Sequence, residues 1–383
     1  MALLHLAAAW ARARGVPVSA VTVDHGLRSE AVAEAGFVAD ACATLQVPHD
    51  TLRWTGWDGR GNLQAAARAA RYRLMVDWAH GLGIDAIVLG HTKDDQAETF
   101  LMRLARGSGP DGLSGMAASH RQNGMLWLRP LLGVRRETLR DYLSRGGQGW
   151  IEDPSNRDMR FERVRVRQAL AGLGDVGLTV DGLADRCARM AMVREALDHL
   201  ARETAESAGI HDRGDLLFES ARLLAAPRET RLRLLAAALC WVASADYRPR
   251  LAALESAAAA AFAGERRSLH GCLLSSDGAR LRISREPNAV RGVVAAPDRP
   301  WDTRWRLFGP QINDVHLRAL GETGLAHCTG WRETGLPRAS LLASPAVWRG
   351  TDLVAAPLAG RPGGWRAELA PPADDVLQVV ISH

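Results

Sequence analysis

The sequence predicts an α/β fold: a doubly wound parallel sheet, followed by a helical domain and a small β-rich tail. Over residues 1–145, helix-like stretches alternate with short β-branched runs, which is the order of a parallel sheet. Beyond residue 180, long alanine- and leucine-rich stretches give way to a segment rich in Gly, Pro and Trp. We therefore expect three domains, at residues 1–174, 175–290 and 291–383.

The first domain alternates helices and strands from its start. Apolar spacing and β-branched runs predict helices at Met1–Arg14, Glu30–Leu45 and Asn62–Gly81, and strands at Val18–Val23, Thr51–Trp54 and Ile84–Leu89. A parallel unit normally begins with a strand whose carboxyl end carries the ligand loop. Because this chain opens in a helix, we expect that a strand and its loop are missing in front of Met1.

Later segments are assigned in the same way. We expect a helix near Arg135–Arg145, a turn at Asp153–Asn156, helices at Leu183–Ala208, Ala221–Val242 and Pro249–Ala263, and a hairpin at Leu269–Arg285. The hairpin turns at Ser276-Asp277-Gly278, a typical turn sequence. In the tail, short strand-like runs predict short strands, and the residues there indicate no function.

Composition excludes several classes of protein. The chain of 383 residues is 47% hydrophobic and 24% charged, as in ordinary globular proteins, and no apolar run is long enough to span a membrane. Met1–Trp10 lacks the basic start and the cleavage site of a signal peptide, so we expect a cytoplasmic protein. The cysteines are five in number and form no CxxC pair, which predicts reduced structural thiols.

The charge balance is basic, with a formal net charge of +5 and a pI near 9.3. Nearly all of the positive charge is arginine, and Lys93 is the single lysine. Arginine binds phosphates through a forked pair of hydrogen bonds, which favours a nucleic-acid partner. GC-rich coding would enrich Arg, Ala and Gly without any ligand, so composition leaves both explanations open.

The strongest local signal lies at residues 87–99, where an apolar strand runs through Gly90 into a polar helix start. Ligands bind at this edge of open α/β sheets. A helix beginning near Thr92 would place Asp95 and Glu98 on one face, with His91 just before it. Capping by Thr92 and the helix dipole would explain one aspartate without any ligand. A metal site built from His91, Asp95 and Glu98 is the weaker alternative, because no second cluster supports it.

Two further groups of charged residues follow the same logic. Asp24, His25 and Arg28 end the strand near Val23 and would lie at the same edge of the sheet, although a turn and a helix cap would also explain them. In the helix predicted at Asn62–Gly81, Arg68 and Arg71 share a face and could reach a phosphate. A solvated helix face is the alternative for these two arginines.

Arginines recur at helical spacing in a third group, formed by Arg160, Arg163 and Arg167. A stripe of this kind can hold a nucleic-acid backbone by charge and forked hydrogen bonds. Ion pairs with Asp153, Asp158 or Glu162 would explain the same stripe without nucleic acid.

Taken in order, these segments resemble the tRNA(Ile)-lysidine synthetase branch of the PP-loop ATP pyrophosphatases, a superfamily with a Rossmann-like fold of the adenine nucleotide alpha hydrolase type. The resemblance covers VDHGLR at 23–28, ARAARY at 67–72, LGHTKDDQAETFLMRLARGSGPDGLSGM at 89–116, RPLLGVRRETLRDYL at 129–143, WIEDPSNRD at 150–158 and RVRVR at 163–167. The hairpin at 269–286 matches the family's second domain more loosely.

The resemblance implies a two-step ligation. ATP, with Mg²⁺, adenylates C2 of cytidine 34 in the isoleucine tRNA with a CAU anticodon, and free lysine then displaces AMP. By position, the resemblance assigns the catalytic role to His91, Asp95, Glu98 and Arg71, and the lysine ammonium to Asp95 and Glu98. It assigns the nucleotide side to Asp24, His25, Arg28 and Arg71. It assigns tRNA binding to Arg160, Arg163 and Arg167 and to the helical domain at residues 175–290. It assigns no metal ligand within this chain, and it is compatible with a homodimer.

Two departures from the family stand out. The SGGxDS loop, whose backbone amides cradle pyrophosphate, normally stands just before a MALLHL-like helix, which here begins at Met1. We therefore expect that this chain by itself does not bind ATP productively, and a start codon assigned too late is the favoured cause. Val164 also replaces the usual Asn. The alternatives are a tRNA-binding remnant without catalysis and a PP-loop tRNA thiolase, which the missing CxxC disfavours.

Overall fold

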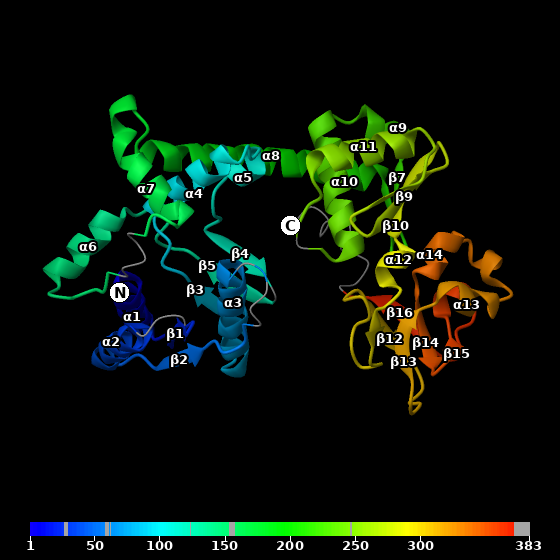
Figure 1. Ribbon diagram of the computed structural model, residues 1–383, viewed down its shortest axis with the longest axis horizontal. Helices are drawn as coiled ribbons and strands as arrows, with labels where there is room; N and C mark the ends of the chain where they lie inside the picture. The colour runs from blue at the N-terminus through cyan, green and yellow to red at the C-terminus, as the bar shows by residue number, and fades with distance from the viewer. Residues whose placement is uncertain are drawn as a thin grey trace. The chain divides into compact units, whose positions relative to one another are not determined.

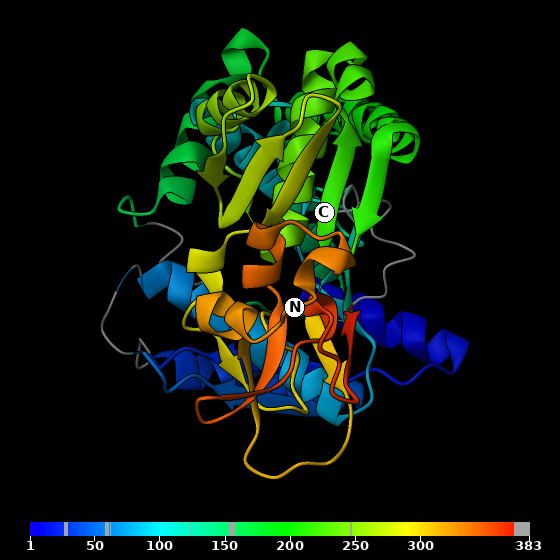
Figure 2. The same ribbon diagram turned by 90° about the vertical axis from the view of Figure 1, so that its right-hand side faces the viewer.

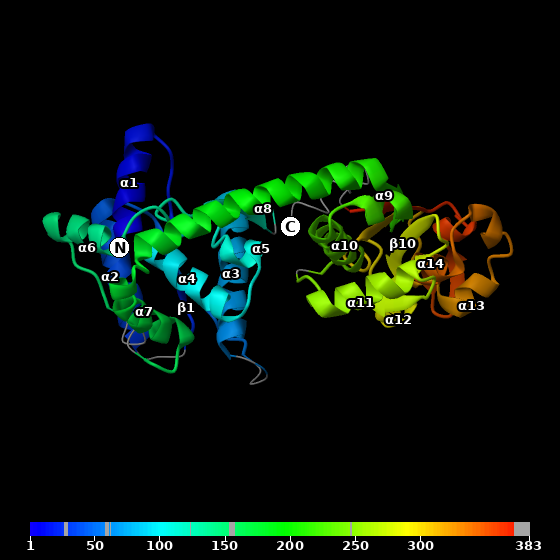
Figure 3. The same ribbon diagram turned by 90° about the horizontal axis from the view of Figure 1, so that it is seen from above.

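The computed structural model describes residues 1–26, 30–57, 61, 63–122, 124–152, 158–245 and 247–370. The chain divides into two compact units, Met1–Arg194 and Glu195–His383. Their border lies within α8 (Val180–Ala208), which is one continuous helix (Figure 3). The three-domain division remains a prediction beside these two units.

Unit 1 carries the alternation that the sequence predicts (Figure 1). Its helices are α1 (Ala2–Arg14), α2 (Glu30–Leu45), α3 (Leu63–Gly81), α4 (Lys93–Ala105), α5 (Pro110–Leu113), α6 (Arg136–Arg145) and α7 (Glu162–Gly172), with a 3-10 turn at Gly174–Val176. Its strands are β1 (Ala20–Asp24), β2 (His49–Arg53), β3 (Ala86–Val88), β4 (Ser119–Gln122) and β5 (Met125–Leu128). The predicted elements up to residue 105 and the helix at 136–145 are confirmed. The predicted turn at 153–156 lies outside the described residues.

Parallel pairing confirms the α/β fold class. β1 pairs in parallel with β2, and β3 pairs in parallel with β5, while β4 adds an antiparallel edge to β5. The sequence did not predict β4, because its residues Ser119–Gln122 are polar and mostly exposed. Between the strands, α3 contacts both β1 and β3. It packs on a core that includes Ile87 and the 1% exposed Trp127.

Unit 2 begins with a mixed helix and sheet layer. Helices α9 (Ser220–Ala225), α10 (Arg228–Ala243) and α11 (Leu251–Phe262) pack with a five-stranded antiparallel sheet whose strands are β6 (Gly209–Asp212), β7 (Asp215–Glu219), β10 (Arg280–Arg285), β9 (Cys272–Ser276) and β8 (Arg267–Leu269), in that order. Figure 2 shows this sheet in green to yellow. The predicted hairpin is confirmed as β9 and β10.

Two details of this layer differ from the sequence prediction. The predicted helix at Ala221–Val242 is two helices, because Pro227 caps α10 and cannot continue α9. The sequence did not predict β6 and β7. In β7 four successive residues are buried, so the alternation that identifies a half-exposed strand is absent.

The tail is β-rich, as predicted. Its strands are β11 (Val294–Ala295), β12 (Trp305–Phe308), β13 (His316–Ala319), β14 (Pro345–Arg349), β15 (Asp352–Ala355) and β16 (Arg366–Leu369). Its short helices are α13 (Gly321–Ala326) and α14 (Arg338–Leu342), and α12 (Pro287–Val290) immediately precedes the tail. The tryptophans serve as core, since Trp301, Trp305, Trp348 and Trp365 are all buried. All five cysteines are buried and outside any disulfide. Among the described residues, no helix is both long and apolar enough to cross a membrane.

A buried ionic cluster joins the tail to the sheet of unit 2. The carboxylate of Asp215 accepts hydrogen bonds from Arg282 at 2.7 Å and from Ser340 of α14 at 2.5 Å. Arg282 also reaches Asp212 at 2.9 Å. Burial raises the pKa of Asp215, although its two hydrogen-bond donors act in the opposite direction. Removing Arg282 would therefore leave a buried carboxylate without the cation that it contacts directly.

We predict that Arg282→Met lowers the free energy of unfolding of the protein by about 3 kcal/mol, because breaking one side of a buried ion pair leaves the other charge uncompensated. Urea unfolding followed by tryptophan fluorescence measures the change. Arg222→Met is the matched control, since Arg222 pairs with Glu219 at 2.9 Å with both side chains half exposed. We expect the control within about 0.5 kcal/mol of the wild type. Equal effects of the two substitutions would contradict a structural role for Arg282.

Candidate active site

The start of α4 is fixed by a reciprocal cap. The Thr92 hydroxyl accepts a hydrogen bond from the Asp95 backbone N–H, and one carboxylate oxygen of Asp95 accepts from the Thr92 backbone N–H at 2.7 Å. The capping role that the sequence offered as an alternative is therefore present for Asp95. Because the cap uses only the Oδ2 atom, Oδ1 remains available to other partners.

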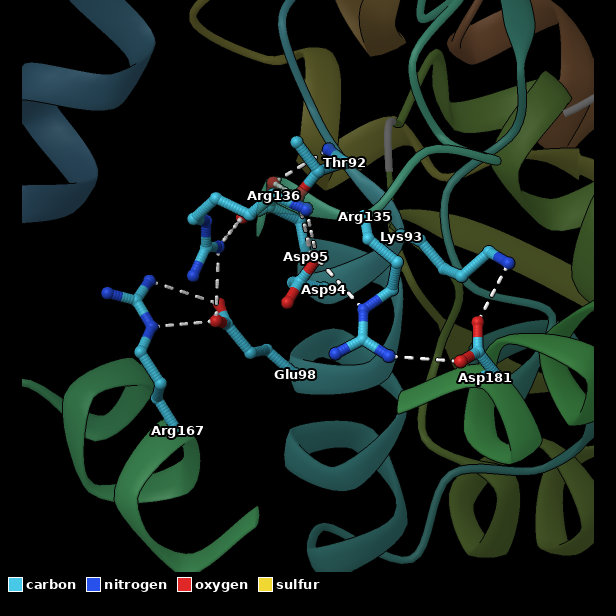
Figure 4. Close-up of polar contacts among 9 residues, drawn as sticks. All are labelled: Thr92, Lys93, Asp94, Asp95, Glu98, Arg135, Arg136, Arg167 and Asp181. Atoms are coloured by element: carbon cyan, nitrogen blue, oxygen red, sulfur yellow. Dashed lines mark hydrogen bonds and ion pairs between the residues drawn. The ribbon is translucent and has the colours of Figure 1, made fainter. Parts of the chain in front are cut away.

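Glu98 lies one turn further along α4 and is only 1% exposed. Three guanidinium groups surround its carboxylate: Arg136 at 3.2 Å, Arg163 at 3.2 Å and Arg167 at 2.8 Å. Figure 4 shows Arg136 and Arg167 converging on Glu98 from two different helices. A carboxylate this deeply buried requires such compensation, since an unpaired charge would cost several kcal/mol.

The guanidinium of Arg136 lies between the carboxylates of Asp95 and Glu98, the two acidic residues that the sequence predicts for this site. Its Nη2 atom lies 3.3 Å from Oδ1 of Asp95 and 3.2 Å from Oε1 of Glu98 (Figure 4). Burial raises the pKa of Asp95, but the hydrogen bonds from Thr92 and the charge of Arg136 outweigh it and hold this pKa below its usual value. Asp95 is therefore ionised at neutral pH, as a site for a cation requires.

A second set of ion pairs holds α6 against α4. The carboxylate of Asp94 accepts a hydrogen bond from the Arg136 backbone N–H at 2.7 Å and lies 3.8 Å from the Arg135 guanidinium. Asp181, at the start of α8, pairs with Lys93 and Arg135, each at 2.9 Å (Figure 4). These contacts fix the first residue of α6, from which the side chain of Arg136 reaches the site.

His91 precedes the cap and is partly buried. The pKa of His91 is lowered to about 4: burial is the main cause, Asp95 acts in the opposite direction, and the charges of Arg129, Arg163 and Arg68 add to the lowering. The imidazole is therefore neutral at pH 7. Its Nδ1 atom is buried and has no hydrogen-bond partner among the described residues.

Among the residues predicted to bind the nucleotide, Asp24 and His25 lie at the end of β1. Asp24 ends this strand, is buried, and accepts a hydrogen bond from the backbone N–H of Gly26 at 2.8 Å. Burial and the positive charge of Arg71 lower the pKa of His25, which places Arg71 of α3 near the end of β1. Arg71 is exposed, and no hydrogen bond or ion pair joins it to another described residue. Arg28 lies outside the described residues.

The predicted tRNA-binding arginines divide into two kinds. Arg160 is exposed and binds Asp158 with its Nη2 atom at 2.6 Å, so the ion-pair alternative holds for this residue. Arg163 and Arg167 instead reach inward to Glu98. None of the three pairs with Glu162 in the described chain, and Asp153 lies outside the described residues.

Sequence reasoning missed Arg135, Arg136 and Asp181. The two arginines stand in the family-like block RPLLGVRRETLRDYL, but no spacing in that block relates them to residues about forty positions earlier. Their contact with α4 exists only in the folded chain. The described residues also contain no cluster of three or more His, Cys, Asp or Glu side chains that could hold a metal ion.

Comparison with known proteins identifies the family. A PP-loop domain model matches residues 1–173. The tRNA(Ile)-lysidine synthase of Ruegeria pomeroyi is 46% identical over 383 residues, which cover 100% of this chain and 91% of that protein. The chain belongs to the tRNA(Ile)-lysidine synthase family. The synthase of Bradyrhizobium diazoefficiens is 39% identical over 75% of this chain and 87% of its own.

Membership of the synthase family confirms the resemblance drawn from the motifs, and the PP-loop match indicates that the family uses ATP. A third relative, from Methylobacterium nodulans, is 41% identical over 71% of this chain and 83% of its own. Among solved structures, the U34-tRNA thiolase NcsA from Methanococcus maripaludis aligns with a TM-score of 0.41 and 13% identity, covering 49% of this chain and 67% of that chain. That likeness is too weak to support a thiolase.

We predict that His91 shows no titration midpoint between pH 5 and 8, because its folded-state pKa of about 4 lies below the ordinary 6.5. The folded chain then binds fewer protons than the unfolded chain, so the contribution of His91 to stability rises with pH from about 4 to 6.5 and is complete above. Side-chain NMR of the histidines, assigned with His91→Gln, measures the midpoint. A midpoint near 6.5 would show that His91 is solvated rather than desolvated.

Proposed function

We propose that this chain ligates lysine to C2 of cytidine 34 in the isoleucine tRNA with a CAU anticodon, through an adenylated intermediate, and releases AMP and pyrophosphate. The observation that supports this most directly is that the carboxylates of Asp95 and Glu98 lie on one face of α4, within a chain of the lysidine synthase family. Lysidine pairs with A rather than G, so the modified tRNA would read AUA in place of AUG.

For the adenylation step, we assign the nucleotide to the end of β1 and the facing part of α3. Arg71 has a side chain without a partner among the described residues, and it is near enough to His25 for its charge to lower the pKa of that histidine. Such a cation can stabilise the charge that develops on the phosphates of ATP. Mg²⁺ would arrive with ATP, since this ion keeps several waters and binds largely through phosphates rather than a protein cage. Asp24, His25 and Arg28 would line the same side.

For the ligation step, Asp95 and Glu98 would bind the ammonium of lysine, and His91 would lie beside it. A general base works best when its pKa is near the working pH. A pKa of about 4 makes His91 a weak base, so in our proposal it orients the substrate through its buried Nδ1 atom. Proton removal from the attacking amine would then fall to another acceptor, such as a phosphate oxygen.

For tRNA, we propose that Arg160 contacts the backbone, because its side chain is exposed and, within the part of the chain that the structure describes, pairs with its near neighbour Asp158 alone. Arg163 and Arg167 would act mainly by holding Glu98, and they remain candidates for tRNA contact through their partly exposed side chains. A homodimer and a cytoplasmic location stay predictions.

We predict that the native protein, expressed from its own locus, adds the mass of one lysine to the isoleucine tRNA with a CAU anticodon. Addition requires ATP, and we expect one AMP released for each lysine joined. Mass spectrometry of the digested tRNA, with lysine or ATP omitted as controls, measures the product. An unmodified tRNA together with salt-sensitive tRNA binding would support a binding protein without catalysis instead.

We predict that Arg71→Met lowers the rate of AMP release by about a hundredfold or more, because a charge contact to a transferring phosphoryl group is lost. Arg73→Met is the matched control, since Arg73 lies two residues away on α3 and is also exposed. Its rate should stay within about twofold of the wild type, as expected for a surface substitution away from the site. Equal losses in both variants would place the nucleotide away from Arg71.

A further inference from the structure

One guanidinium occupies the position that a substrate ammonium would take. If Asp95 and Glu98 bind lysine together, the cation must lie within hydrogen-bond reach of both carboxylates. Nη2 of Arg136 lies there already, 3.3 Å from the first and 3.2 Å from the second (Figure 4). A lysine ammonium and this guanidinium cannot occupy the same space.

The charge balance of the site leads to the same conclusion. Two carboxylates, Asp95 and Glu98, face three guanidinium groups, and Glu98 is 1% exposed. Adding a lysine ammonium beside all three would place a second excess positive charge in a poorly solvated site, which is costly. Replacing one guanidinium by the ammonium leaves the balance unchanged.

Arg136 is the guanidinium suited to leave. It is the one that bridges both carboxylates, whereas Arg163 and Arg167 approach Glu98 from α7 and can keep this buried charge compensated. The side chain of Arg136 is 29% exposed, so it has access to solvent. It also stands at the first position of α6, where the helix dipole disfavours a cation, while Asp94 holds its backbone N–H in place.

We propose that Arg136 is a resident counter-cation of the lysine site, which lysine must displace to bind, and that Arg136 thereby sets the affinity for lysine. This inference rests on the proposed function of Asp95 and Glu98. In the free protein Arg136 keeps the two carboxylates paired and in place. The apparent Kd for lysine then equals the intrinsic Kd divided by the fraction of molecules in which Arg136 has left the site.

The test is isothermal titration of L-lysine into the native protein and into Arg136→Gln. We expect the variant to bind lysine about tenfold more tightly, as it would if the wild-type site were open in roughly a tenth of the molecules. L-norleucine, which keeps the α-amino group but lacks the ε-ammonium of lysine, should show no such gain. Arg140→Gln is the matched control on the same helix, because Arg140 pairs with Glu152 at 2.7 Å and both are half exposed. We expect its Kd for lysine to equal that of the wild type.

A second variant keeps the test decisive if Arg136→Gln fails to fold. Arg136→Lys retains a positive charge but lacks the planar fork, so it should hold the carboxylates less firmly. We expect tighter lysine binding in this variant too, by a smaller factor. Unchanged or weaker binding in either folded variant would overturn the exchange and make Arg136 a group that orients the carboxylates for lysine.

Failure of the proposed function gives a different result. If the native protein and Arg136→Gln both fail to bind lysine, Asp95 and Glu98 do not form a lysine site and the exchange falls with it. If the native protein binds lysine and Asp95→Asn abolishes that binding, the site stands. In that case the direction in which Arg136→Gln changes the Kd for lysine decides whether lysine displaces Arg136.

Discussion

The buried carboxylate of Glu98 is the constraint on which the arrangement of this site depends. At 1% exposure an ionised carboxylate is stable only with charge compensation, and three arginines from α6 and α7 supply it. The ion pairs with Glu98 hold α6 and α7, which are distant in sequence, next to α4. The same ion pairs bring Arg136 beside Asp95, and the contacts of Asp94 with Arg135 and with the Arg136 backbone fix the start of α6 in the matching position.

The long helix α3 positions the arginines that act on two histidines of unit 1, His25 and His91. It packs against both β1 and β3, and it carries Arg71 toward His25 and Arg68 toward His91. Both histidines are held neutral, since burial and these cations lower each pKa. Neutral imidazoles leave the positive charge of this region to the guanidinium groups, which can attract anionic groups such as phosphates.

Much of the fold was predictable from local patterns. The helices and strands up to residue 105 follow apolar spacing, and the cap at Thr92 follows from the residues Thr92 and Asp95. Prediction was incomplete where tertiary contacts override local patterns. β4 is too polar and β7 too uniformly buried to show an alternating signal, and the break at Pro227 divides a run that otherwise reads as one helix.

The sequence by itself determined the family, the parallel α/β core and the residues on the face of α4, because motifs and helical spacing are local properties of the chain. Only the tertiary structure decided which cations meet those residues. Arg163 and Arg167, read from sequence as a stripe for tRNA, turn inward to Glu98, and Arg136 lies between both carboxylates. The physical reason is that the cost of burying a charge depends on distant partners brought near by folding, and spacing along the chain carries no information about them.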